Sequence, residues 1–110
     1  MFARVSTYEL EAGRASEAIN AFAPAIDDIR TLDGFVDGLF LVERDGLHAM
    51  TVTLWDSLDA MERSRVTASR ARSEAAQAAS AVVTSSYEYE VGLHTGQGAG
   101  NMALGAPNRS

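Results

Sequence analysis

The order of two kinds of hydrophobic pattern is the strongest constraint on how this chain can fold. Four runs are rich in β-branched and aromatic residues, which is typical of strands, and two regions have helical spacing or helical propensity. The strand-like runs are residues 2–10, 35–43, 47–55 and 82–93. The helical regions lie between Ser16 and Leu32 and over residues 58–80. The sequence therefore predicts the order β-α-β-β-α-β.

Local signals refine these elements. Ser16 is placed to cap the first helix, and Pro24 predicts a kink or a break within it, because proline removes a backbone donor. Asp45-Gly46 is a hairpin signal between the second and third strands, and Asp56-Ser57 supplies an N-cap to the second helical region. That region is rich in alanine and poor in large apolar residues, so we expect two short helices or one bent helix. The apolar face of the first helix is expected to hold Ala18, Ile19, Phe22, Ile26 and Ile29.

The predicted order is that of an α+β, ferredoxin-like sandwich, in which helices cover one face of an antiparallel sheet. Both faces of the second and third strands contain large apolar groups. In the second strand these are Phe35, Leu39 and Leu41 on one side and Val36, Phe40 and Val42 on the other. An apolar face without helices over it is an exposed patch, and such patches mark interfaces. The sequence therefore predicts a homodimer that forms through the sheet.

Composition removes several classes of function. The chain has no cysteine and no lysine among its 110 residues, which excludes thiolate, iron–sulfur and Schiff-base chemistry. Its net charge of −6 gives no electrostatic footprint for nucleic acid or for an anionic membrane surface. The apolar stretches are too short to span a bilayer, and the first residues do not read as a signal peptide, so we expect a cytoplasmic protein. The two histidines and the scattered carboxylates show no recognised metal-ligand spacing, so no metal is expected.

Four segments together resemble an antibiotic biosynthesis monooxygenase-type domain. They are Phe2-Ala3-Arg4-Val5, Leu32-Asp33-Gly34-Phe35, Thr53-Leu54-Trp55-Asp56-Ser57 and Tyr87-Glu88-Tyr89-Glu90-Val91. The resemblance covers residues 1–93 and implies a dimeric α+β barrel, in which the sheets of two subunits pack face to face. Residues 94–110 hold four glycines and are expected to form a flexible tail that can be removed without loss of the fold.

The resemblance implies oxygenation of a phenol, quinol or anthrone without a cofactor, in an apolar pocket between helices and sheet. Two other classes stay open: a non-catalytic ligand-binding or stress-related dimer, and a small isomerase or cyclase that uses the same pocket. Haem-degrading relatives would carry an Asn on the first strand and a His and a Trp on the later helices. Here Thr7 stands near the expected Asn, and residues 58–80 contain neither His nor Trp, which argues against haem degradation.

His48 is the candidate general base, because imidazole titrates near neutral pH. We expect it to share a strand face with Met50, Val52 and Leu54 that looks towards the helices, although a solvated histidine is ordinary so close to a hairpin turn. The candidate substrate-binding residues are Thr7, Phe22, Phe40, Met50, Trp55, Tyr87 and Tyr89. The first four are candidates because of their expected facing, and the last three also have a simple packing or interface role. Four arginines of the second helical region either attract an anionic substrate or form a solvated face: Arg63, Arg65, Arg70 and Arg72.

Overall fold

The computed structural model describes residues 1–95, and the order of its elements confirms the predicted α+β fold. The strands are β1 (Phe2–Glu9), β2 (Phe35–Val42), β3 (His48–Trp55) and β4 (Val82–Glu90). The helices are α1 (Ala15–Ile29), α2 (Leu58–Arg63) and α3 (Arg65–Ala78). The tail expected over residues 94–110 lies, from residue 96 onward, outside the described residues. No helix of the described part is long and apolar enough to cross a membrane.

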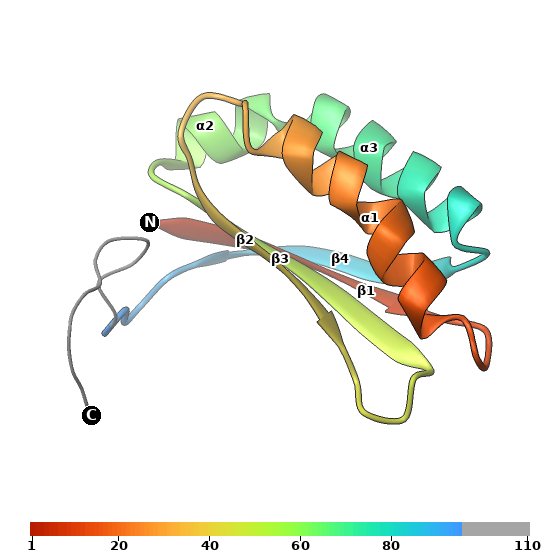
Figure 1. Cartoon of the computed structure of the whole chain (residues 1–110). Helices are drawn as coiled ribbons and strands as arrows, with labels where there is room; N and C mark the ends of the chain where they lie inside the picture. Colours follow the sequence, from red (N-terminus) through yellow and green to blue (C-terminus); the bar gives the residue numbers. More distant parts are fainter. Residues whose placement is uncertain (96–110) are drawn as a thin grey trace, which may run out of the picture.

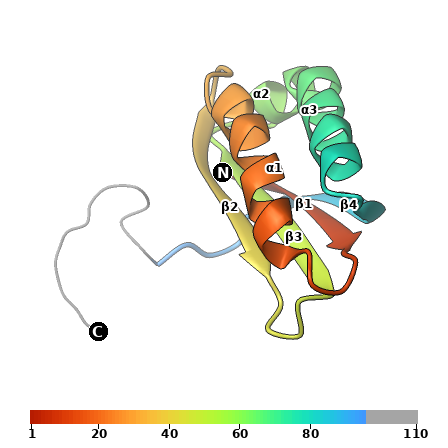
Figure 2. The same cartoon turned by 45° about the vertical axis from the view of Figure 1, so that its right-hand side comes forward.

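The four strands form one antiparallel sheet in the order β2-β3-β1-β4. Figure 1 shows the three helices on one side of this sheet, with α1 and α3 lying along each other above it. The turned view in Figure 2 shows the same two layers. No element of residues 1–95 covers the opposite side, which we call the open face.

Two details of α1 differ from the sequence prediction. The helix begins at Ala15 with Arg14 in the N-cap position and no side-chain cap, so Ser16 lies inside the first turn and does not cap it. Of the kink or break expected at Pro24, the break does not occur, since the helix is continuous from Ala15 to Ile29. Packing explains this continuity, because Phe22, Ala25 and Ile29 are buried on either side of the proline and hold both halves in place. Ile19, expected on the buried face, is about half exposed.

The second helical region forms two helices, α2 and α3, which is one of the two arrangements predicted from the sequence. Ser57 is the N-cap of α2, and its side chain accepts a hydrogen bond from the Ala60 amide at 3.1 Å, which confirms the predicted cap. The buried residues of α3 are all alanines, so this helix approaches α1 closely and brings no large apolar side chain to the core.

The expected facing of β3 is wrong. Trp55 is fully buried under the helices, and strand alternation then places Thr51 and Thr53 on the same side. His48, Met50, Val52 and Leu54 consequently point to the open face. A register shift between Phe35 and Asp37 likewise turns Phe35 toward Trp55 on the helix side, away from the face that Leu39 and Leu41 share.

The core between helices and sheet is built largely from aromatic contacts. Phe22 stacks on Phe40 with ring centroids 4.5 Å apart and meets the edge of Tyr8 at 4.8 Å. Phe35 meets Trp55 edge to face at 5.5 Å. Tyr8, Phe22 and Trp55 are each at most 1% exposed, so this part of the layer is closed.

Candidate functional site

Polar side chains occupy the helix-facing side of β1. Arg4 is 3% exposed and donates from Nη1 to Ser64 Oγ at 3.0 Å and from Nη2 to the Met61 carbonyl at 2.8 Å. The same Nη2 reaches Glu88 Oε2 at 2.8 Å. The guanidinium thus joins β1, β4 and the C-terminal end of α2, and its donors are taken up by structural contacts.

Glu88 accepts from a second arginine as well. Arg65 donates from Nε to Oε2 at 3.0 Å and from Nη2 to Oε1 at 2.5 Å. These hydrogen bonds, with those from Arg4, lower the pKa of Glu88 to about 2 against the opposing effect of desolvation. Glu88 is therefore a fixed anion that compensates two cations.

Tyr8 and Arg72 are the residues of this layer that could take part in a reaction. The Tyr8 hydroxyl lies 2.9 Å from Thr51 Oγ1, and burial raises the pKa of Tyr8. Arg72 on α3 is half-buried, and desolvation lowers its pKa while its charge acts on Tyr8. Among residues 1–95 Arg72 has no hydrogen-bond or ion-pair partner. A half-buried cation whose charge acts on a buried phenol favours an anionic oxygen between them.

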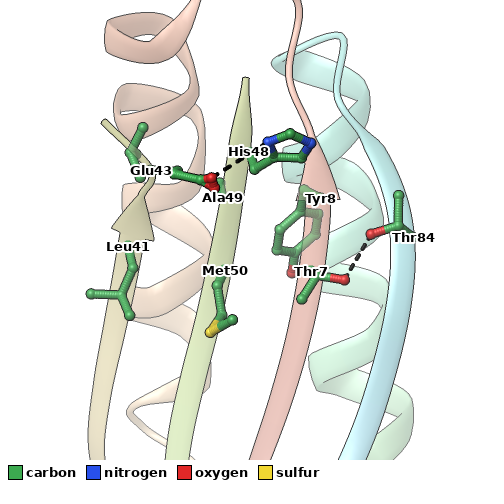
Figure 3. Close-up of a pocket in the computed structure, with 9 residues that line it drawn as sticks. Thr7, Tyr8, Leu41, Glu43, His48, Ala49, Met50 and Thr84 are labelled. Atoms are coloured by element: carbon green, nitrogen blue, oxygen red, sulfur yellow. Dashed lines mark hydrogen bonds and ion pairs between the residues drawn. The ribbon is translucent and has the colours of Figure 1, made fainter. Parts of the chain in front are cut away.

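A pocket of about 440 Å³ lies on the open face, at the end of the sheet that carries the β2–β3 hairpin. Its lining residues come from all four strands and the hairpin: Thr7, Tyr8, Leu41, Val42, Glu43, His48, Ala49, Met50 and Thr84. Figure 3 shows Leu41, Met50 and Thr7 side by side on neighbouring strands, with His48 at the rim. Thr7 Oγ1 and Thr84 Oγ1 are 2.7 Å apart, and His48 Nδ1 is 3.2 Å from Asp45 Oδ2.

The structure separates the sequence-predicted site residues into three places. Phe22, Phe40 and Trp55 lie in the core, where Trp55 Nε1 donates to Thr53 Oγ1 at 3.0 Å. Thr7, His48 and Met50 line the pocket on the open face. Tyr87 and Tyr89 are more than half exposed, and their pairing with Val5 and Ala3 places them on the open face too.

The sequence prediction missed Tyr8, Arg4 and Glu88, and it included Arg72 only in a group of four arginines. The available signal was the alternation within β1, where polar Arg4 and Ser6 share one face with Tyr8. Hydrophobicity alone predicts that this face is exposed to solvent, because buried charges are rare unless they are paired. Their pairing with Glu88 and Ser86, more than 75 residues away, is visible only in the fold.

These features define a ferredoxin-like α+β domain with a paired buried charge network and one uncovered face. Solved structures at 25% identity or below share this fold. A candidate antibiotic biosynthesis monooxygenase from Deinococcus radiodurans is 19% identical with a TM-score of 0.69, and the match covers 86% of this chain and 96% of that one. SnoaB, a cofactor-independent oxygenase from Streptomyces nogalater, is 19% identical with a TM-score of 0.62, over 84% and 94% of the two chains.

A third similar structure is a point mutant of MhuD with two manganese protoporphyrin IX molecules bound per active site. It is 25% identical with a TM-score of 0.65, and the match covers 87% of this chain and 99% of MhuD. No protein-family model and no curated protein matches the sequence. The antibiotic biosynthesis monooxygenase-like fold predicted from the sequence motifs is therefore confirmed.

Proposed function

We propose that this protein is a cofactor-independent monooxygenase that oxidises a phenolic, quinol or anthrone-type aromatic. The likeness in fold to SnoaB supports this kind of reaction. The structural observation that carries the proposal is Arg72 of α3, which is half-buried, has no hydrogen-bond or ion-pair partner among residues 1–95, and acts by its charge on the buried Tyr8. The helices α2 and α3 contain no His, so they offer no imidazole to bind haem iron.

The roles of the two residues follow from their charges. The Arg72 guanidinium stabilises the negative charge that develops on a substrate oxygen when the substrate loses a proton. The Tyr8 hydroxyl donates a hydrogen bond to the same oxygen, and Thr51 orients that hydroxyl. An ionised anthrone then reduces dioxygen directly. One oxygen atom replaces the two hydrogens of the methylene carbon, and the other leaves as water, so no external reductant is required.

Dioxygen uptake with a panel of quinols and anthrones tests the proposal. We expect Arg72→Gln to lower kcat/KM at least tenfold, because the developing charge loses its cation. Arg70→Gln is the matched control, since Arg70 is exposed two positions earlier on the same helix, and it should stay within twofold. Absence of uptake with every member of the panel would overturn the monooxygenase proposal.

A non-catalytic ligand-binding protein is the second candidate, and a specific observation favours it. Tyr8, Phe22 and Trp55 close the layer between helices and sheet, whereas the pocket of about 440 Å³ opens on the other face. Saturable binding of an aromatic ligand without dioxygen uptake, weakened by Met50→Glu in the pocket, would support this candidate over the first.

We also propose that the protein is a homodimer joined through the open face. This face carries large apolar side chains that no element of residues 1–95 covers, and a monomer would leave them in contact with water. The exposed members include Leu39, Leu41, Tyr87 and Tyr89, each between 45% and 62% exposed in the single chain. A second copy is the occupant that the fold favours, because it would bury the same surface on both partners.

A further inference from the structure

The β2–β3 hairpin brings together three side chains that are common metal ligands. His48 Nδ1 lies 3.2 Å from Asp45 Oδ2 and 3.8 Å from Glu43 Oε2, and one ligand atom from each residue lies within 4.8 Å of the others. We propose that these three residues bind one first-row divalent transition-metal ion of the Zn²⁺ type. This inference goes beyond the proposed function, which uses the helix side of the sheet.

The spacing of the ligand atoms fits such an ion. Bonds of about 2.0–2.2 Å from a tetrahedral Zn²⁺ place neighbouring ligand atoms roughly 3.3–3.6 Å apart. The separations of 3.2 and 3.8 Å from His48 Nδ1 lie close to that range, so small side-chain rotations complete the site. All three residues are exposed, and such rotations meet no packing barrier.

The turn already orients one ligand. The Leu47 amide donates to Asp45 Oδ1 at 2.7 Å, which leaves Oδ2 directed at the imidazole, and this amide bond is the main reason why the pKa of Asp45 is lowered. Gly46 adopts a φ of 74°, which allows the tight reversal. Orientation of a ligating group by a second hydrogen bond is a common property of protein metal sites.

The donor set selects the class of ion. One imidazole nitrogen and two carboxylates suit Zn²⁺, Mn²⁺ or Ni²⁺, and the two negative charges balance the charge of the ion. A site with three protein ligands leaves at least one coordination position for water or for a small ligand. His48 also lines the pocket on the open face, so the ion would lie at the rim of that pocket (Figure 3).

Isothermal titration of the whole chain with ZnCl₂ in a weakly coordinating buffer tests this site. We expect saturable binding of one ion per chain. His48→Gln should weaken it at least tenfold, because the nitrogen ligand is lost. Asp45→Asn and Glu43→Gln should weaken it severalfold each, and the Asn keeps an oxygen that can accept from the Leu47 amide.

His94→Gln is the matched control, since His94 is the other histidine of the chain, and it should change the affinity less than twofold. Circular dichroism of each variant checks that the fold is kept, which is expected for exposed hairpin residues. No saturable binding below millimolar Zn²⁺ would overturn the proposal. Equal affinity in the His48→Gln variant would overturn it as well.

Discussion

The carboxylate of Glu88 carries much of the electrostatic organisation of this fold, because Arg4 and Arg65 both depend on it. Its pKa is about 2 in the folded protein, compared with an ordinary value of 4.5. A carboxyl whose pKa is depressed by folding contributes stability that is complete above the ordinary pKa. That contribution is lost as the pH falls from about 4.5 toward 2.

We therefore expect Glu88→Gln to lower the free energy of unfolding by about 1–2 kcal/mol at pH 7, after allowance for solvent screening of a partly exposed pair. Urea denaturation at pH 7, 4 and 2.5 measures the difference from the wild type. The difference should shrink steadily across this series. Glu90→Gln, an exposed carboxylate two residues along the same strand, should cost less than about 0.5 kcal/mol at every pH. A difference that is independent of pH would contradict the assignment.

At the same scale, the sequence identifies residue types better than it identifies neighbours. The packing roles of Phe22, Phe40 and Trp55 were accessible, because large apolar groups at helix or strand spacing enter the core. The side of the sheet to which His48 points could not be predicted. Strand alternation divides the residues into two sets but does not say which set the helices cover. The set that includes Met50, Val52 and Leu54 is more apolar and is nevertheless the one turned away from the helices.

Among the elements, the loop before β2 packs closely at Gly34, which has the nearest neighbours of the glycines in residues 1–95. Gly34 has a φ of 80°, and a Cβ built on it would lie 2.3 Å from Ala60 Cβ and 2.7 Å from Asp56 Oδ1. Its carbonyl accepts from the Asp56 amide at 2.8 Å, so the loop cannot move aside without loss of that bond. The close packing at Gly34 therefore holds the first residue of β2 next to the start of α2.

Gly34→Ala should consequently lower stability by about 3 kcal/mol, the sum of left-handed backbone strain and overpacking. Gly13→Ala is a matched control, because Gly13 has the same φ of 80° and open space around its Cβ position. It should cost about 1 kcal/mol, from the backbone strain alone. Thermal or urea unfolding of both variants measures the two values. Equal losses would show that the contact with α2 carries no energy.

The order of the elements was predictable because each depends on local patterns that survive in the sequence, such as the Asp45-Gly46 turn and the Ser57 cap. The residue at which α1 starts and the continuity of the helix through Pro24 could not be predicted from local patterns. Both depend on tertiary packing, which outweighs a local signal worth about 1–3 kcal/mol. The register shift at Phe35 also depends on tertiary packing, because it accompanies the contact between Phe35 and Trp55.

For the whole molecule, the two faces of the sheet are matched to different tasks. The helix side combines the small alanines of α3 with long polar side chains from β1. Among these, Arg4 forms hydrogen bonds with Ser64 and Glu88. Within residues 1–95 the open face has no buried charge network of this kind, and away from the hairpin it presents mainly aliphatic and tyrosine side chains. A domain of about 100 residues buries roughly two thirds of its unfolded surface, so a second copy on this face would add substantially to its stability.

The last prediction concerns this dimer. Leu39 is half exposed at the open face and is not part of the buried core, so Leu39→Arg should leave the fold of one subunit intact. In a twofold dimer the substitution would bury two unpaired guanidinium groups, which is strongly unfavourable. Sedimentation at micromolar concentration should show a dimer for the wild type and a monomer of 11.7 kDa for the variant, with an unchanged circular dichroism spectrum. Val66→Arg on the outer side of α3 replaces an equally apolar and more exposed residue, and it should remain dimeric. A monomeric wild type, or a Leu39→Arg variant that sediments as a dimer, would rule out the open face as the interface.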